Sequence, residues 1–380
     1  MTLLVTAALA ACFRHRDPQA AYDHALETFR HGDMPAAGIE AEKDYKEFRS
    51  VSREWAWKFT ILRARILYAQ GMNEAVLKLL TSEPDARPSG DLAIRQLWLE
   101  GLAYTSLSKF SDAELRFEES ERLCGVSNSS VCTNVISAQG ALEMQRGQYA
   151  QAQVFFERAL DHSRANATKS PEPGPLLDLS WSALRLAHFD EALDWANAAR
   201  SIALAQGSAG AAQTALGNMG WAYYKLGDLE KAEGMFIEAE AQAEKLGQTS
   251  SQIGWLIDAG YVDLDRGRLP AAQQAFEQSL KLARKIGSRE DIVTALQALA
   301  FVSERTDKLD EAKRYADDAR SMAQADRNGR DIVYARLVQG RVSARLHDTK
   351  LAKSNFIFVA ESKDTPVFLK WEAERSLARL

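Results

Sequence analysis

Small residues recur along this chain at a fixed step of 40 positions, and this recurrence limits the fold more than any other feature. From Gly220 the step meets a small residue each time, at Gly140, Ser180, Gly260, Ala300 and Gly340. From Ala232 it meets only alanine, at Ala152, Ala192, Ala272, Ala312 and Ala352. Upstream the step shortens slightly, giving Gly101 with Ala113, Ala64 with Ala75, and Ala25 with Ala37. The recurrence predicts a repeat protein of about nine units between roughly residues 18 and 362.

The unit around Gly220 shows what each repeat contains. Gly220 leaves room for a neighbouring helix, and Gly227-Asp228 ends a helix and turns the chain. Ala232 lets a second helix pack back on the first, with Phe236 filling the space beside it. The turn recurs at Gly32-Asp33, Gly71-Met72, Gly147-Gln148 and Gly267-Arg268, with degenerate forms at Ala187, Asp307 and His347. The aromatic residue recurs at Phe117, Phe156, Phe276 and Phe356. Each unit is therefore predicted to be a helical hairpin.

This pattern resembles the tetratricopeptide repeat (TPR), whose standard unit is about 34 residues long. The longer step is similar to the long-helix TPR arrays of kinesin light chains, of some bacterial regulators, and of bacterial lipoproteins that carry a CHAT peptidase domain. The resemblance implies an all-α, right-handed superhelical solenoid of about nine hairpins plus a C-terminal helix. Stacked hairpins would bury one continuous core, because no hairpin can cover its own apolar face.

Composition sets limits on the class of function. The net charge of −5 argues against nucleic acid as a partner, which would call for a basic face. There is no apolar run of about 18 residues, so no transmembrane helix is expected. The histidines are scattered, and no catalytic, phosphate-binding or metal-ligand motif is present. We therefore expect no enzyme activity, no cofactor and no metal.

Residues 1–12, MTLLVTAALAAC, resemble a lipoprotein signal segment. A short apolar run ends in small residues before Cys12, which would be lipidated, although no Lys or Arg precedes the run. This interpretation predicts an exported lipoprotein, periplasmic or anchored in the outer membrane only through Cys12. The alternative is a stray apolar tail or part of a first helix, on a cytoplasmic protein.

The predicted solenoid covers residues 13–364. The proline-rich insert at 166–175 is either a flexible joint or only a long loop. Cys124 and Cys132 either form a disulfide or are two buried thiols. Residues 365–380 form one more amphipathic helix, which would be a capping helix or the first helix of a truncated further repeat.

In TPR superhelices the first helix of each unit lines the concave surface, and the resemblance places a ligand there. Aromatic residues follow the small position at 40-residue steps, at Trp181, Trp221, Tyr261 and Phe301. Trp98, Tyr224 and Asn218 fall on the same face, and Asn218 holds the position where kinesin-light-chain-like arrays contact the peptide backbone. Arg341 and Arg345 would receive an acidic segment or form a solvated face. The alternative for the aromatic residues is ordinary core packing.

Three functions agree with these observations. The first is a non-enzymatic scaffold that binds a peptide or protein segment in the concave groove. The second is the regulatory arm of a CHAT-type peptidase whose catalytic half lies outside this chain. The third is a cytoplasmic signal-transduction module. The sequence leaves the oligomeric state and the identity of the partner open.

Overall fold

The computed structural model describes residues 16–380 except 32, 83–86, 126–128, 130, 167–171, 327–328 and 363–364. This part of the chain contains nineteen α-helices and no strand. None of these helices is long and apolar enough to cross a membrane. Cys12 and the rest of the 1–12 segment lie outside the described residues.

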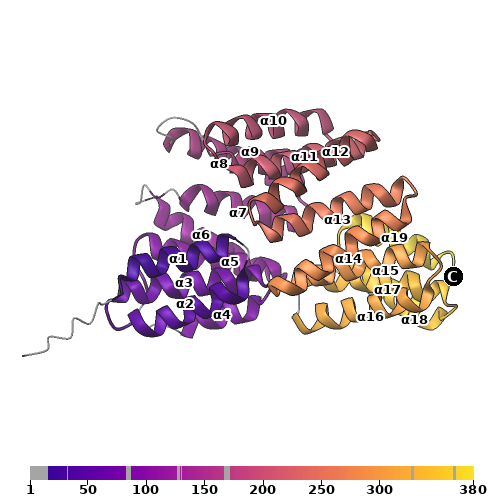
Figure 1. Ribbon diagram of the computed structural model, residues 1–380, viewed down its shortest axis with the longest axis horizontal. Coiled ribbons are helices and arrows are strands. Elements are labelled where there is room, and N and C mark those ends of the chain that lie inside the picture. The colour runs from indigo at the N-terminus through magenta and orange to yellow at the C-terminus, as the bar shows by residue number, and fades with distance from the viewer. Residues whose placement is uncertain are drawn as a thin grey trace, which may run out of the picture.

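Eighteen of the helices form nine consecutive hairpins, and α19 follows them (Figure 1). The hairpins are α1 (Pro18–Arg30) with α2 (Met34–Phe48), α3 (Arg53–Ala69) with α4 (Asn73–Ser82), α5 (Asp91–Ser106) with α6 (Phe110–Cys124), α7 (Val131–Gln145) with α8 (Tyr149–Asn166), α9 (Gly174–Arg185) with α10 (Phe189–Ala205), α11 (Ala209–Leu226) with α12 (Leu229–Lys245), α13 (Thr249–Asp265) with α14 (Leu269–Ile286), α15 (Arg289–Arg305) with α16 (Leu309–Asp326), and α17 (Gly329–Arg345) with α18 (Thr349–Glu361); α19 spans Val367–Leu377. The all-α solenoid predicted from the 40-residue step is confirmed.

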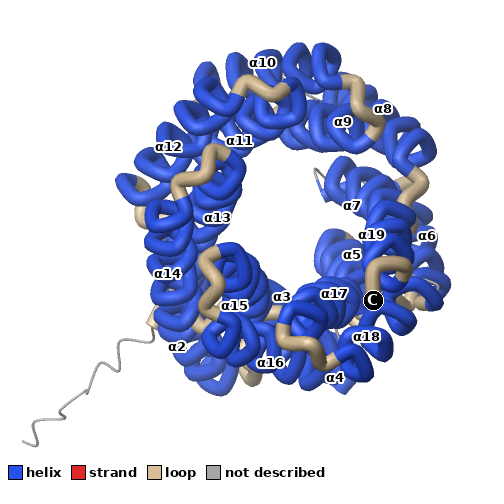
Figure 2. The backbone as a smooth tube through the Cα atoms, turned by 90° about the vertical axis from the view of Figure 1, so that its right-hand side faces the viewer, coloured by secondary structure: helices blue, strands red, loops and turns tan. Residues whose placement is uncertain are grey.

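The hairpins wind around a central lumen (Figure 2). The first helices of the units, such as α9, α11, α13 and α15, lie toward the lumen, and the second helices, such as α10, α12, α14 and α16, lie outside. Residues that follow the small position on a first helix are therefore on the elements that surround the lumen.

Inside each hairpin, the predicted small position meets an aromatic ring. A Cβ added to Gly220 would lie 2.7 Å from the ring of Phe236, closer than any real contact. The same overlap occurs in four other units, between Gly101 and Phe117, Gly140 and Phe156, Gly260 and Phe276, and Gly340 and Phe356. All five rings are almost completely buried. The glycines therefore let the second helix bring a phenylalanine directly against the backbone of the first.

The turn inside most hairpins requires a left-handed backbone. Glycine supplies it at Gly71, Gly147, Gly227 and Gly267, where φ lies between 73° and 84°. The degenerate turns use non-glycine residues with φ near 60°, at Ala187, Asp307 and His347, and also at Ser108, which sequence reasoning missed. The turn geometry is thus kept where the glycine is lost.

The superhelix continues past one full turn, so its two ends pack on each other. Units one to three lie beside α13–α18 (Figure 1), and one buried cluster joins Ala25 and Leu62 to Ile253 and Phe276. The tight turn between α3 and α4 also contacts the start of α15, because a Cβ on Gly71 would lie 3.7 Å from the backbone nitrogen of Glu290. Successive turns of the superhelix are therefore in contact.

Two further sequence expectations concern the connections. A disulfide joins Cys124, the last residue of α6, to Cys132 in α7, with their Cα atoms 5.7 Å apart. Around the proline-rich insert, one buried cluster includes Phe156 of α8, Leu179 of α9 and Ala199 of α10. The hydrophobic core is therefore continuous across the insert.

The C-terminal helix α19 buries Leu369 and Ala373 in a cluster with α17 and α18. This packing covers the apolar face of the ninth hairpin, as a capping helix would. The opposite side of α19 exposes Val367, Phe368 and Trp371.

The Gly220 contact gives a direct stability test. Gly220→Ala should lower the free energy of unfolding by about 1–3 kcal/mol, because the new methyl group overlaps a fully buried ring. Denaturant unfolding followed by circular dichroism would measure it. Gly234→Ala is the matched control, since that glycine is exposed in the middle of α12 with no atom near its Cβ position, and it should stabilise by up to about 1 kcal/mol. Equal effects of the two substitutions would refute the steric account.

Candidate binding site in the superhelix lumen

The four aromatic residues of the predicted ladder sit on inner helices, but they differ in what surrounds them. Trp181 of α9 exposes 40% of its surface. Trp221 packs edge-on against Phe236, with ring centroids 5.8 Å apart, and Tyr261 packs on Phe276 at 5.4 Å. These two rings thus extend the core of their own units toward the lumen. Core packing, the alternative given from the sequence, therefore describes Trp221 and Tyr261, and binding by the ladder stays a prediction.

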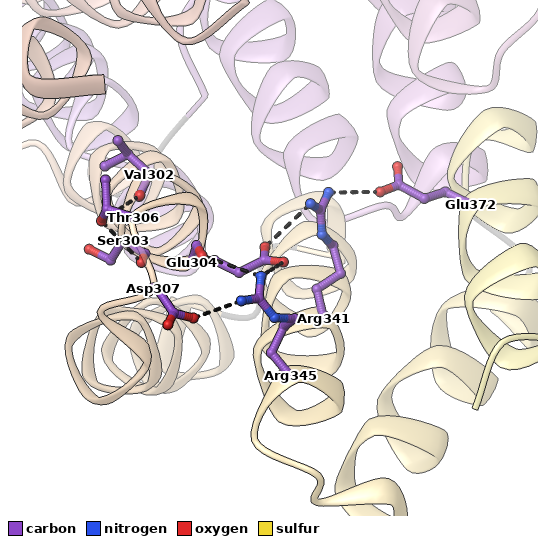
Figure 3. A network of polar contacts seen from close by, with 8 residues as sticks. All are labelled: Val302, Ser303, Glu304, Thr306, Asp307, Arg341, Arg345 and Glu372. Carbon is purple, nitrogen blue, oxygen red and sulfur yellow. Dashed lines mark hydrogen bonds and ion pairs between the residues drawn. The ribbon is translucent and has the colours of Figure 1, made fainter. Parts of the chain in front are cut away.

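Arg341 and Arg345 of α17 belong to a polar network with Glu304 of α15 and Glu372 of α19 (Figure 3). The Arg341 guanidinium lies 4.4 Å from the centre of the Phe301 ring and pairs with Glu304 at 3.3 Å and with Glu372 at 3.1 Å. Arg345 pairs with Asp307 at 2.8 Å and with Glu304 at 3.8 Å. The two arginines proposed to receive an acidic segment are therefore paired with carboxylates of this chain.

The position of Asn218 suggested a contact with the backbone of a bound peptide, but its side chain contacts the backbone of this chain. Its side-chain amide donates to the backbone carbonyl of Leu177, 3.1 Å away on the preceding inner helix. One repeat further, Asp258 accepts a hydrogen bond from Trp221 Nε1 at 3.1 Å, and one repeat earlier Asp178 accepts one from Ser137. Each of these side chains links its helix to the inner helix before it. The row thus joins successive units along the lumen, and the amide N–H of Asn218 is used in that role.

Burial raises the pKa of the two carboxyl groups in this row, Asp178 and Asp258. It raises the pKa of Asp258 to about 7, while the hydrogen bond from Trp221 acts in the opposite direction. Burial likewise raises the pKa of Asp178 to about 6, against the hydrogen bond from Ser137. It also raises the pKa of Tyr261 to about 12, with help from the nearby Asp258 carboxylate. Asp258 therefore titrates near neutral pH inside the solenoid wall.

A cavity of about 1060 Å³ opens between the inner helices and α19. Units four and five contribute Tyr149, Trp181 and Arg185, and α11 contributes Trp221 and Lys225. The remaining described lining residues are Phe110, Gln145, Arg146, Gly147, Gln148, Leu184, Ala187, Phe189, Tyr334, Thr365, Pro366, Val367, Phe368, Lys370 and Trp371. The cavity thus combines aromatic rings with cationic side chains.

The cavity includes only part of the predicted site. Trp181 and Trp221 line it, whereas Tyr224, Tyr261, Phe301 and Asn218 do not. Trp98 lies partly buried among the clusters of α5, α6 and α7, and Tyr224 donates its hydroxyl to Asp265. Sequence reasoning missed Arg185, Lys225 and the residues of α19. Arg185 and Lys225 share one register position 40 residues apart, which could have revealed them, but no local signal places α19 opposite α9.

The described residues contain no group of three or more His, Cys, Asp or Glu side chains that could hold a metal ion. The described residues that line the cavity include no Asp, Glu, His, Cys or Ser. The arrangement offers apolar faces, hydrogen-bond donors and positive charge. Such a surface can bind a ligand.

Comparison with known proteins agrees with this fold. Residues 213–239 match the family model described as tetratricopeptide repeat. No curated protein matches the sequence significantly. The chain thus contains one matched tetratricopeptide repeat within a TPR-like helical solenoid, and the similarity to CHAT-domain proteins stays a resemblance.

Three solved structures share the architecture at 13% sequence identity. A Rap protein complexed with Competence and Sporulation Factor aligns with a TM-score of 0.60, covering 94% of this chain and 99% of that one. NprR in complex with its cognate peptide NprX aligns at 0.52, covering 96% and 97%. Aspartyl phosphate phosphatase F from Bacillus subtilis aligns at 0.52, covering 100% and 94%. At this identity the likeness establishes the fold alone.

Asp258 gives a pH-dependent prediction. Its folded-state pKa of about 7 lies above the value of about 3.9 for an unfolded Asp, so the folded chain binds this proton more tightly. The stability gained is fully present below about pH 4 and is lost as the pH rises through about 7. Asp258→Asn, which still accepts from Trp221, should match the native chain near pH 4 and exceed its stability by at least about 1 kcal/mol at pH 8.

Denaturant unfolding at several pH values would measure this difference. Glu244→Gln, at an exposed position of α12, is the control for removing a carboxylate. A stability difference for Asp258→Asn that does not change between pH 4 and pH 8 would contradict the buried-carboxyl account.

Proposed function

We propose that this protein is a non-enzymatic interaction scaffold that binds a peptide or protein segment in the lumen, at the cavity between α9, α11 and α19. The observation that carries the proposal is the partly exposed Trp181 in the wall of that cavity. A large aromatic ring offers much apolar area for few lost torsions, and tryptophan is enriched among the residues that dominate binding energy. Phe368 and Trp371, which are 44% and 69% exposed, extend this apolar surface from α19.

The structural neighbours support the proposal. The Rap protein was solved with Competence and Sporulation Factor, and NprR with its cognate peptide. Both share the superhelical fold along nearly their whole length. One neighbour is named a phosphatase, so the non-enzymatic part of the proposal rests on the described lining of this cavity, which has no carboxylate, histidine or cysteine.

A peptide selection tests the proposed function. A random dodecapeptide library displayed on phage would be selected on the full chain, and the enriched peptides would be measured by fluorescence anisotropy. Trp181→Ala should weaken them by about tenfold or more, the range expected for truncating a central aromatic anchor. Ile237→Ala, an exposed apolar residue on the outer helix α12, should leave the affinity unchanged. No enrichment, or equal affinity for Trp181→Ala, would refute the site.

We also propose that the chain is exported and anchored by lipid on Cys12, because residues 1–12 carry the apolar run and small residues of a lipoprotein signal. The cytoplasmic location is the alternative. The Cys124–Cys132 disulfide agrees with an oxidising compartment, since such bonds rarely persist in the cytosol.

Intact-mass spectrometry of the chain from membranes of an expressing bacterium tests this anchor. The expected species begins at Cys12 and carries diacylglyceryl and acyl groups. Cys12→Ala should abolish the modification and leave the solenoid folded, because residue 12 precedes the first hairpin. An unmodified chain that begins at Met1 in the soluble fraction would contradict export.

A further inference from the structure

The charged side chains among the described residues that line the lumen cavity are all positive. Its described lining contains four cationic side chains and no carboxylate, although the whole chain has a net charge of −5. The four cations are Arg146, Arg185, Lys225 and Lys370. A local excess of positive charge in an acidic protein points to an anionic ligand.

Only one of these cations is paired within the described part of the chain. Arg146 pairs with Glu143 at 2.7 Å and with Glu114 at 2.9 Å. Arg185, Lys225 and Lys370 have no ion pair with any described carboxylate. Arg341 and Arg345, which do not line this cavity, are both paired with carboxylates (Figure 3).

Arg185 is held in place by aromatic rings. Its guanidinium carbon lies 5.0 Å from the ring centre of Tyr149 and 5.4 Å from that of Phe368, and Nη2 donates to the Tyr149 hydroxyl at 2.6 Å. These contacts orient the planar group and satisfy one donor. Since Arg185 makes no other hydrogen bond among the described residues, the remaining N–H groups can receive a carboxylate in the paired geometry that arginine favours.

Lys225 repeats this arrangement one unit along the solenoid. It follows Arg185 by one 40-residue step, and its ammonium lies 5.7 Å from the ring centre of Trp221 and 5.3 Å from that of Tyr224. Packed helices are about 8–10 Å apart, so the two charges stand on neighbouring inner helices at similar height. Lys370 adds a third charge from α19.

We propose that the cavity binds an acidic peptide segment, with side-chain carboxylates of the ligand on Arg185 and Lys225 and an apolar ligand side chain against Trp181 and Trp371. A lone terminal carboxylate would supply one negative charge for three cations, and this mismatch favours Asp and Glu side chains. The inference rests on the proposed function and specifies the chemistry of the ligand at that site.

The test selects a random dodecapeptide library on three forms of the full chain: native, Arg185→Gln/Lys225→Gln, and Arg305→Gln. Arg305 is the control, because it is an exposed cation at the same register position as Lys225, two units along and outside the cavity. Peptides enriched on the native chain and on Arg305→Gln should contain more Asp and Glu than the unselected library. This enrichment should disappear on Arg185→Gln/Lys225→Gln.

Anisotropy then measures an enriched peptide against its counterpart with every Asp and Glu replaced by Asn and Gln. The counterpart should bind the native chain about tenfold more weakly at low salt, and the difference should shrink as salt screens the charges. Lys370→Gln, a single change on α19, should reduce the same preference in a chain that keeps Arg185 stacked between its rings.

The possible outcomes separate the two proposals. Enriched peptides without an acidic bias, or a bias that survives Arg185→Gln/Lys225→Gln, would overturn this inference and leave the proposed binding function standing. Failure to enrich any peptide on the native chain would overturn both.

Discussion

The close contact between a glycine on one helix and a phenylalanine on the next is the interaction on which five of the nine hairpins depend. Where the small position is glycine, the residue sixteen positions later is phenylalanine, as in Gly220 and Phe236. Where the small position is alanine or serine, that later residue is smaller: Ala25 with Ala41, Ala64 with Leu80, Ser180 with Ala196, and Ala300 with Ala316. The largest side chain at this contact is thus found only where the facing position has no side chain, as expected for close-packed interiors. In these five units the contact brings the two helices of the hairpin close together, and stacking of the hairpins produces the superhelix.

The superhelix then creates a site that no single hairpin contains. Because the solenoid passes one full turn, units one to three lock against the later units, and α19 reaches the lumen face of units four to six. Trp181 and Arg185 line this site from α9, and Phe368 and Trp371 line it from α19. The cavity therefore depends on the pitch of the whole array. Substitutions far from it, at the interlocking turns, would change its shape.

Sequence analysis predicted the parts of the structure that repeat. The hairpins, their turns and the small residue beside each ring all follow from periodic positions, because each unit packs in the same way. It could not predict how the cations are paired: Arg345 and Lys225 hold the same register position, yet Arg345 has Asp307 and Glu304 beside it and Lys225 has no described carboxylate. Nor could it show that Asn218 uses its amide to bridge two helices. Such contacts depend on which units become neighbours in space.

Hydrogen–deuterium exchange of the full chain, with and without a peptide selected on it, tests the central claim most directly. The claim is that the ligand occupies the cavity between the inner helices and α19. It predicts slower exchange on binding in residues 145–149, 181–189 and 365–371, with the outer helices α10 and α12 unchanged beyond their turns. Slower exchange confined to outer helices, or to the Arg341–Glu304 region alone, would contradict the claim and place the binding surface elsewhere.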